Sequence, residues 1–405
     1  MSTKAAVSYS TEHDSYNAGR EMSLKALADA RLDKCQFSFA FASSEHDAEK
    51  LIKGIKSVLG EETLILGGTS AGIITGDYMG YEGFHAGILV ISSDEISIDT
   101  HLVEGLKDGE YDTGRKMGEK ISRINELENP NLLLFYDSMQ YDRSKANPFY
   151  QATPILAGIQ SVLNDWPPVA GVGIVGGAMG TKRTELWNND KISKDSILSV
   201  LISGSIRMDT TIMHGLKPAS DYHTITKATG NILFEFDGRP AMEVASEYLG
   251  FIVEPDWKNA MYLITIGVNR GEKYDPFREE NYINRLVLGV DETSGALLVM
   301  EGDLKVGDNF QFMRRSIETD MVSEMAQKLM ESIGTREPLF AFYIACLGRV
   351  KKFFGTEKEE SEEIQKTIGS KMPLLGIYSG TEIARVRDNV MPLDWTGVLC
   401  IFSSK

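Results

Sequence analysis

The sequence predicts an α/β protein with some α+β character, in which mixed β-sheets are flanked by helices. Apolar, β-prone segments alternate with segments of helical periodicity along the 405 residues, which is typical of strands and helices packed in layers. In two places, strand-like segments follow one another across a short polar turn, at 83–91 and 96–103 and again at 197–202 and 206–213. We expect each pair to be antiparallel neighbours, so the sheets are predicted to be mixed rather than purely parallel.

The first block of the chain predicts strand, helix, strand, helix and strand in that order. A short apolar strand is expected at 5–9, and alternating phenylalanines predict a strand at 35–42. Apolar residues at the three- and four-residue spacing of one helix face predict helices at 16–32 and 46–59. The second helix leads to an apolar run that begins at Leu64 and ends in paired glycines.

Two later blocks repeat this plan. Their predicted strands are 132–136 and 168–175, then 339–347, 373–378 and 396–402, and their predicted helices are 111–124 and 148–163, then 320–333 and 359–368. A shift of 110 residues places Asp99-Thr100 on Asp209-Thr210 and Gly105-Leu106 on Gly215-Leu216. We therefore expect repeated strand–helix–strand–strand units with pseudo-symmetry.

Residues 226–257 connect the second and third blocks. They hold the turn Asp237-Gly238-Arg239-Pro240 and then an amphipathic helix. Strands are expected after them at 261–268, 283–290 and 297–301. The turn marks the best place to divide the chain, which gives two domains, 1–240 and 241–405.

The composition excludes several classes of function. The net charge of −16 argues against nucleic-acid binding. The sequence has no run of about eighteen apolar residues and no apolar signal core, so neither membrane insertion nor secretion is expected. Three cysteines, Cys35, Cys346 and Cys400, lie among apolar neighbours, which is typical of reduced thiols in a cytoplasmic protein. The histidines show no metal-binding spacing, so we expect no metal and no cofactor.

Small residues at the ends of predicted strands are the main indication of a binding site. Gly67-Gly68-Thr69-Ser70 ends one strand, Gly176-Gly177 ends the equivalent strand of the second block, and a third small-residue turn is expected after Tyr378. Glycine lets backbone approach a ligand closely, and ligands collect at strand ends in open α/β sheets. We expect these turns to line one cavity.

Charged side chains in the second half of the chain suggest what this cavity binds. Arg349 follows an apolar strand and is a candidate clamp for a carboxylate, and Glu382 follows the next strand and is a candidate acceptor for an amino group. The alternative is that these two side chains pair with each other or with solvent. His214 and Arg285 are secondary candidates.

Two residues raise the alternative of an enzyme. Gly68-Thr69-Ser70-Ala71-Gly72 matches the G-x-S-x-G pattern of serine hydrolases, in which a helix follows the serine directly. The residues from Ile73 onward are β-branched and interrupted by glycine, which disfavours that helix. Cys346 is a second candidate nucleophile, against the alternative of a buried structural thiol. A hydrolase or acyltransferase using Ser70 or Cys346 is therefore the alternative to a binding protein without enzymatic activity.

The order of the motifs resembles the FIST sensory domain proteins, with both the FIST N-terminal and the FIST C-terminal module. The resemblance runs from about residue 35 to the C-terminus and is carried by Gly67–Gly72, Gly176-Gly177, His214–Pro218, Thr226–Asn231, Asp237–Ala241, Arg285 with Gly289–Asp291, Cys346–Arg349, Gly376–Tyr378 and Glu382-Ile383. It implies a cytoplasmic signal-transduction module that binds small ligands such as amino acids. Family members are often fused to an output domain, for which this chain has no room, so a signal is expected to leave through a partner protein in trans or a homo-oligomer.

The sequence thus predicts a site for an amino acid or a similar zwitterion, with no catalytic residue. The expected ligand-binding residues are Gly67, Gly68, Thr69, Ser70, Gly176, Gly177, His214, Arg285, Cys346, Arg349, Tyr378 and Glu382. Backbone N–H groups at the glycine-rich strand ends would bind the ligand carboxylate, with Arg349 as the charged clamp.

Overall fold

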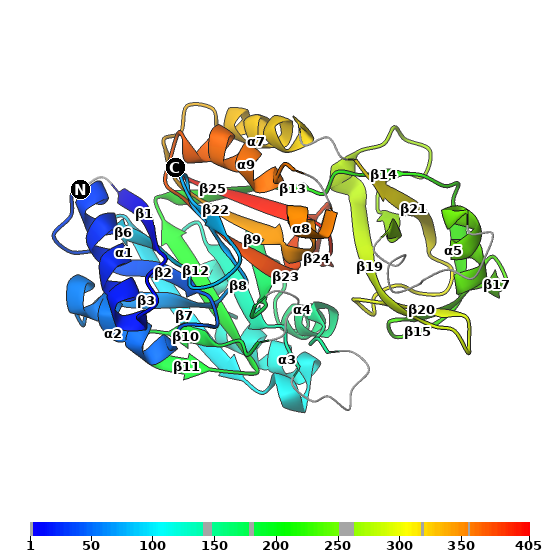
Figure 1. The fold of residues 1–405 in the computed structure, drawn as a ribbon, viewed down its shortest axis with the longest axis horizontal. Helices are drawn as coiled ribbons and strands as arrows, with labels where there is room; N and C mark the ends of the chain where they lie inside the picture. Colours follow the sequence, from blue (N-terminus) through cyan, green and yellow to red (C-terminus); the bar gives the residue numbers. More distant parts are fainter. Residues whose placement is uncertain (1–2, 141–147, 178–181, 251–262, 317–319, 355–356) are drawn as a thin grey trace.

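The computed structural model describes residues 3–140, 148–177, 182–250, 263–316, 320–354 and 357–405. It confirms the mixed α/β fold, with helices packed on the outside of two large mixed sheets and a separate β-barrel beside them (Figure 1). The first residues of the strand expected at 261–268, and the end of the connecting region at 251–257, lie outside the described residues.

Three units of the chain share one order of elements and one order of strands. The first unit comprises β1 (Lys4–Ser10), α1 (Ser15–Ala30), β2 (Phe37–Ala42), α2 (Ala48–Leu59), β3 (Leu64–Thr69) and β6 (Ala86–Ser92), with strand order β1-β6-β2-β3. The second comprises β7 (Ile96–Glu104), α3 (Glu110–Lys120), β8 (Asn131–Asp137), α4 (Ala152–Gln160), β9 (Val169–Ile174) and β12 (Ser196–Gly204), with strand order β7-β12-β8-β9. The third comprises β13 (Ile206–Met213), α7 (Asp320–Ile333), β22 (Pro338–Cys346), α9 (Glu360–Ile364), β23 (Leu374–Val386) and β25 (Gly397–Ser404), with strand order β13-β25-β22-β23.

The pairing directions are also the same in the three units. The second strand runs parallel to the third, and the last strand lies antiparallel between the first and the second. The expectation that β6 pairs with β7, and β12 with β13, is wrong. β6 and β12 are central strands whose two edges are already bonded within their own units, so each short polar turn instead carries the chain from one unit into the next.

Glycines set the packing of the paired helices in the first two units. A Cβ on Gly19 of α1 would lie 2.3 Å from the carbonyl oxygen of Leu51 in α2, and one on Gly114 of α3 would lie 2.2 Å from that of Ile155 in α4. Such distances require that the helix backbones touch, which only glycine permits. The two helix pairs therefore use the same close contact, in agreement with the repeated plan.

The second strands of the three units meet in the centre of the molecule. Phe39 and Phe41 of β2, Phe135 of β8 and Phe342 of β22 form ring contacts with centroids 5.6–6.5 Å apart. All four side chains are buried in one apolar cluster. Aromatic rings of this size remove much apolar surface from water, so this cluster joins the units into one core.

The sheets differ in what covers the edge of the third strand. In the first unit, the hairpin of β10 (Leu186–Asn188) and β11 (Lys191–Ser193) pairs with β3. In the second and third units, β9 pairs with β23 directly, which joins their strands into one sheet of 11 strands that also includes β4 (Ile73–Ile74), β5 (Met79–Gly80) and β24 (Asn389–Leu393). The added hairpin makes the end of β3 unlike the equivalent ends of β9 and β23.

A six-stranded barrel is inserted into the third unit between β13 and α7. Its strands are β21 (Asn309–Arg315), β15 (His223–Thr229), β16 (Ile232–Phe236), β20 (Ala296–Val299), β19 (Tyr282–Asp291) and β18 (Thr265–Asn269), and pairing of β18 with β21 closes it. β14 (Leu216–Pro218) and β17 (Arg239–Pro240) flank it, and α5 (Ala241–Leu249) packs on its apolar core. The predicted division at residue 240 falls between β17 and α5, and barrel strands lie on both sides of it.

Candidate ligand-binding cavity

A small cavity lies at the C-terminal ends of the parallel strands β2 and β3. It encloses about 210 Å³ and is lined by Ala42, Ser43, Ser44, His46, Ala48, Leu51, Thr69, Arg183, Glu185 and Trp187. We call it the inner cavity. A cavity of this volume has room for several water molecules or for a small polar ligand such as an amino acid.

The segment between β2 and α2 forms one wall of the inner cavity. Ser43 and Ser44 follow directly on β2, and α2 begins at Ala48 after Asp47, whose carboxylate accepts a hydrogen bond of 3.0 Å from the backbone N–H of Lys50. Such an N-cap satisfies one of the free N–H groups of the first helical turn. The short serine-containing segment between strand and helix therefore faces the space beyond the strand ends.

Trp187 closes one wall of the inner cavity, and Gly67 makes room for it. β10 runs antiparallel to β3 with Trp187 opposite Gly67. A Cβ on Gly67 would lie 3.1 Å from the indole Nε1 of Trp187 and 1.8 Å from the carbonyl oxygen of Ala40, and the φ of Gly67 is +149°. This position needs glycine both for its backbone conformation and for the close approach of its neighbours.

Arg183 supplies a cation at the inner cavity. At Gly176 the chain folds back closely on itself. A Cβ there would lie 2.6 Å from the carbonyl oxygen of Arg183 and 2.5 Å from that of Lys182. Lys182 is held by an ion pair with Glu45. The exposed Arg183 makes no ion pair or hydrogen bond with any residue that the structure describes, so its guanidinium is available to an anion.

Four polar atoms of the lining residues are buried and have no hydrogen-bond partner among the residues that the structure describes: the hydroxyls of Ser43 and Ser44, Nε2 of His46 and Nε1 of Trp187. Ser43 and Trp187 are only 6% and 2% exposed. Buried polar groups in folded proteins are almost always hydrogen-bonded, and leaving one unsatisfied costs about 1–3 kcal/mol. Polar groups of this kind gathered around one cavity are suited to a polar ligand.

The charge state of His46 follows from its surroundings. Its Nδ1 lies 3.2 Å from the hydroxyl oxygen of Ser15, which orients the ring. Burial lowers the pKa of His46 to about 4, so the ring is neutral at neutral pH. The fixed charges of the inner cavity are therefore Arg183 and Glu185, and the Glu185 carboxylate lies 2.9 Å from Nζ of Lys194.

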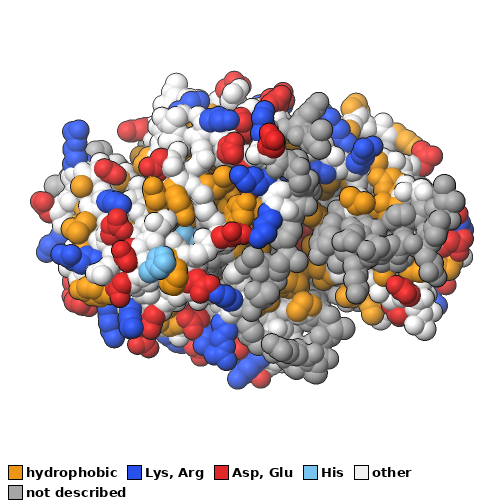
Figure 2. All heavy atoms as spheres, in the orientation of Figure 1, with side chains coloured by type: hydrophobic (Ala, Val, Ile, Leu, Met, Phe, Trp, Pro, Cys, Tyr) orange, Lys and Arg blue, Asp and Glu red, His pale blue; other side chains and the backbone are white. Residues whose placement is uncertain are grey.

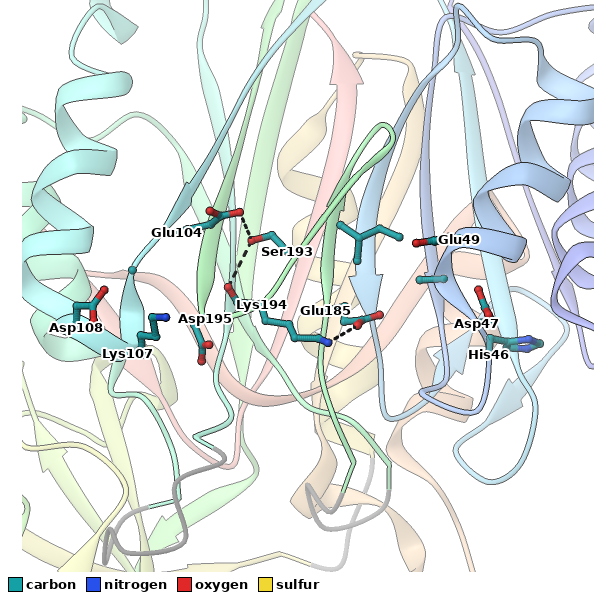
Figure 3. Close-up of a pocket in the computed structure, with 13 residues that line it drawn as sticks. His46, Asp47, Glu49, Glu104, Lys107, Asp108, Glu185, Ser193, Lys194 and Asp195 are labelled. Carbon is teal, nitrogen blue, oxygen red and sulfur yellow. Dashed lines mark hydrogen bonds and ion pairs between the residues drawn. The ribbon is translucent and has the colours of Figure 1, made fainter.

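The inner cavity adjoins a larger and more open groove, which we call the outer groove. It has a volume of about 920 Å³ and shares His46, Ala48 and Glu185 with the inner cavity. Figure 3 shows that its side chains come from the start of α2 on one side, from the end of β7 and the segment after it on the other, and from the β10–β11 hairpin between them. Glu104 accepts a hydrogen bond of 2.9 Å from the hydroxyl of Ser193 in this groove.

Four of the residues predicted from the sequence lie at the inner cavity or directly behind it. Thr69 lines it, and its Oγ1 accepts a hydrogen bond of 3.0 Å from the backbone N–H of Glu185. Gly67 and Gly176 position Trp187 and Arg183, as described above. A Cβ on Gly68 would lie 2.8 Å from the carbonyl oxygen of Glu185, so this glycine lets the β10 hairpin approach β3.

Ser70 follows Thr69 and Gly177 follows Gly176 in the sequence, but neither Ser70 nor Gly177 lines the inner cavity. The fully buried Ser70 hydroxyl donates a hydrogen bond of 2.6 Å to the carbonyl oxygen of Gly72, which fixes the turn after β3. Gly177 has a φ of +67° in the turn that leads towards Lys182. Both residues therefore shape turns at the strand ends.

Arg349 lies elsewhere and is fully engaged within the protein. Its guanidinium forms a buried ion pair with Glu360 and donates further hydrogen bonds to the carbonyl oxygens of Met213 and, at 2.9 Å, Trp395. Arg315 contacts the same Glu360 carboxylate at 2.6 Å. Arg349 was predicted to clamp a ligand carboxylate, with pairing to Glu382 or solvent as the alternative. Its partner in the structure is Glu360.

Tyr378 and Glu382 lie within a strand. The turn expected after Tyr378 is wrong, because β23 continues to Val386 through a register shift between Ser379 and Thr381. Glu382 accepts hydrogen bonds from the Ser379 hydroxyl at 2.6 Å and from the Thr396 backbone N–H at 3.2 Å, and burial raises its pKa to about 8. It is therefore a largely protonated carboxyl group at neutral pH, unlike a free carboxylate that binds an amine.

The other predicted residues are also buried in the third unit and the barrel. His214 is hydrogen-bonded to Glu279 and to the backbone N–H of Leu216. Arg285 forms a two-point ion pair with Asp303 at 2.6 and 2.7 Å. Cys346 is 5% exposed, and burial raises the pKa of its thiol well above the usual value. Cys35, Cys346 and Cys400 form no disulfide and are buried.

Sequence reasoning missed most of the lining of the inner cavity. The missed polar residues are Ser43, Ser44, His46, Arg183, Glu185 and Trp187. The serines carried a usable signal, since they follow a predicted strand and precede a predicted helix, as the glycine turns were argued to do. Arg183, Glu185 and Trp187 carried none, because the β10–β11 hairpin belongs to no repeated unit.

Comparison with known proteins gives the same family as the motifs. The FIST N domain matches residues 36–239 and the FIST C domain matches residues 241–385. An uncharacterised protein of Mycobacterium tuberculosis is 22% identical over 269 residues, which are 66% of this chain and 70% of that protein. An uncharacterised protein of Methanocaldococcus jannaschii is 27% identical over 184 residues, which are 44% of this chain and 35% of that protein.

Among solved structures, a cyanuric acid hydrolase from A. caulinodans aligns with 100% of this chain and 99% of its own, with 8% identity and a TM-score of 0.39. A likeness at this level carries no information about activity. The two domain matches together cover most of the chain, and the chain belongs to the FIST family. FIST domains are sensory modules that bind ligands. None of the described helices is long and apolar enough to cross a membrane.

Proposed function

We propose that this protein is a cytoplasmic sensory module that binds an amino acid or a similar zwitterion in the inner cavity. The observation that carries the proposal is the set of four buried polar atoms around that cavity that have no partner in the described part of the chain, together with the Arg183 guanidinium, which bonds to no described residue. A ligand that satisfied these atoms would remove the cost of leaving them unpaired.

The charges of the inner cavity suit a zwitterion in one orientation. The guanidinium of Arg183, the hydroxyls of Ser43 and Ser44 and the indole N–H of Trp187 are donors that fit a carboxylate. Glu185, where the inner cavity meets the outer groove, is the acceptor for the ammonium group. In this arrangement Arg183 binds the ligand carboxylate, which is the role that the sequence analysis suggested for Arg349.

We propose that the module acts by binding alone, with its signal passed to a partner protein in trans or through a homo-oligomer. Against a nucleophile at Ser70 stands its hydrogen bond to Gly72; against one at Cys346 stand its burial and raised pKa. Activity-based probes for serine and cysteine nucleophiles test this point. Labelling of either residue in the folded protein would favour the hydrolase or acyltransferase instead.

A thermal-shift screen of the common amino acids tests the binding proposal. A ligand present at a hundred times its Kd stabilises the protein by about 2.7 kcal/mol. We expect at least one amino acid to raise the Tm of the wild-type protein and of Arg20→Ala, which removes an exposed cation from α1, and to leave the Tm of Arg183→Ala unchanged. An absence of any shift with the wild-type protein at saturating concentrations would refute the proposal.

A further inference from the structure

One buried carboxylate holds both ends of the β10–β11 hairpin. Asp137, the last residue of β8, is fully buried. It accepts hydrogen bonds from the hydroxyl of Thr184, which precedes β10, and, at 2.9 Å, from the backbone N–H of Asp195, which follows β11. Its Oδ1 also accepts a hydrogen bond of 3.1 Å from the backbone N–H of Met139. The hairpin extends the sheet of the first unit, so Asp137 anchors it from the second unit.

The anchored hairpin carries one wall of the inner cavity. Thr184 directly precedes Glu185, which lines the inner cavity together with Trp187 of β10. Figure 3 shows Glu185 and Asp195 on the two legs of this hairpin. The positions of Glu185 and Trp187 at the inner cavity therefore depend on how Asp137 holds the hairpin.

The anchor depends on an ionised carboxylate. An ionised carboxylate accepts hydrogen bonds at both oxygens and donates none. Asp137 uses both, because its Oδ1 faces the backbone N–H of Met139 and its Oδ2 faces that of Asp195. A proton on either oxygen, or the amide nitrogen of an asparagine in its place, sets a donor against a donor and costs one of these backbone hydrogen bonds.

We propose that Asp137 is a positioning residue for the inner cavity, whose ionised carboxylate holds the hairpin where Glu185 and Trp187 contact the ligand. Ligand binding then depends on pH through a side chain that does not itself line the inner cavity. This inference rests on the proposed function and deepens it, because it names a residue that controls the same site.

The pH at which the anchor is lost follows from the surroundings of Asp137. Burial raises its pKa to about 6, against the hydrogen bonds from Thr184, Asp195 and Met139, which favour the ionised form. Among the described residues, the titratable groups that face it are Asp195, whose negative charge raises this pKa, and Tyr150, whose hydroxyl donates to Asp195. Asp137 becomes protonated as pH falls through 6, so ligand affinity is full above this pH and falls below it.

Calorimetric titration at several pH values tests the inference, with an amino acid of neutral side chain that stabilises the wild-type protein. Such a ligand keeps both of its charges between about pH 5 and about pH 7. Burial lowers the pKa of His46 in the inner cavity to about 4, so this ring stays neutral in that range. With a pKa of about 6, Asp137 is roughly one-tenth ionised at about pH 5 and nine-tenths ionised at about pH 7, so the Kd should be about tenfold higher at the lower pH.

Matched variants separate Asp137 from other effects of pH. Asp137→Asn should bind at least about tenfold more weakly than the wild-type protein at about pH 7 and should show no pH dependence of Kd. Asp29→Asn, the same change at an exposed position of α1, should keep the wild-type profile. Thr184→Val removes the hydrogen bond that favours ionised Asp137, so it should move the midpoint of the profile above pH 6, and Thr184→Ser should restore it.

Hydrogen exchange of the protein without ligand tests the anchor itself. In Asp137→Asn, the backbone amides of residues 184–195 should exchange at least about tenfold faster than in the wild-type protein, because their segment opens locally. The amides of α1 and α2 should keep their wild-type rates.

The results distinguish this inference from the proposed function. A wild-type Kd that does not change with pH, or a pH dependence that survives in Asp137→Asn, overturns the inference and leaves the proposed function standing. Unchanged exchange of residues 184–195 in Asp137→Asn, or equally faster exchange in α1 and α2, overturns the anchoring of the hairpin. If no amino acid binds the wild-type protein, the proposed function is refuted, and the exchange experiment decides on the anchoring by itself.

Discussion

Replacement of Arg349 by alanine tests whether this residue is structural or binds the ligand. Arg349 and Glu360 are both buried, and Arg349 also donates to the carbonyl oxygens of Met213 and Trp395. Removing one partner of a buried ion pair costs about 3–5 kcal/mol, because the other charge is left uncompensated. Arg315 still contacts Glu360 at 2.6 Å, which lowers this cost. The carbonyl oxygens of Met213 and Trp395 lose the hydrogen bonds that Arg349 donates, which raises it.

These contributions combine to an expected loss of about 4 kcal/mol in the free energy of unfolding. With an unfolding entropy of about 2.1 cal/mol/K per residue, a chain of this length loses about 5 °C of Tm. Differential scanning calorimetry measures the loss directly. Arg349→Lys should lose less, because a lysine keeps the charge opposite Glu360 but not the two-point contact.

The matched change is Arg183→Ala, which removes an exposed arginine that has no side-chain partner among the described residues. It should change the free energy of unfolding by no more than about 0.5 kcal/mol and abolish the increase in Tm caused by the ligand. Arg349→Ala should show the opposite pattern, with a lower Tm and a normal response to ligand. If Arg349→Ala keeps the wild-type Tm and loses the ligand response, Arg349 is the ligand clamp and our assignment is wrong.

Three further changes have expected outcomes. Gly67→Ala should cost more than about 3 kcal/mol, since its Cβ would lie 1.8 Å from a backbone oxygen, whereas Gly60→Ala, also at a positive φ but with nothing within 4 Å, should cost about 1–2 kcal/mol by chemical denaturation. The pKa of Glu382 is raised from 4.5 to about 8, so its stabilising contribution is full below pH 4.5 and is lost as pH rises through 8. Glu382→Gln should therefore flatten the pH dependence of stability between these values by on the order of 1 kcal/mol per pH unit, and an unchanged slope would contradict the raised pKa. Trp187→Phe should weaken ligand binding, because it removes an indole N–H that has no partner among the described residues; equal binding by calorimetry would show that the N–H does not contact the ligand.

The repeated units were predictable from sequence because each carries its own local signals. Alternating phenylalanines identified β2, helical periodicity identified α1 and α2, and the offset of 110 residues joined the equivalent strands β7 and β13. The strand pairing was not predictable in the same way. A short turn between two strands usually makes a hairpin, and only the three-dimensional arrangement shows that β6 and β12 have both edges bonded within their own units.

The site was predictable only as far as the strand ends. Thr69 and the glycines around it were found because a buried strand that ends in small residues is visible in the sequence. The polar residues that face the inner cavity come from three separate segments, including the β10–β11 hairpin that pairs with β3. Arg349 and Glu382 looked available because charge is visible in a sequence and burial is not. In the structure both are buried and bonded within the protein.

The central claim is that the ligand occupies the inner cavity at the ends of β2 and β3. The most direct measurement is calorimetric titration of an amino acid that stabilises the wild-type protein into the variant Ser44→Leu. Ser44 is half-buried and lines the inner cavity, so a leucine there fills the space with apolar atoms at little cost to the fold. We expect one binding site per chain in the wild-type protein and no binding in the variant. Unchanged affinity in Ser44→Leu, with a wild-type Tm, would show that the ligand binds elsewhere.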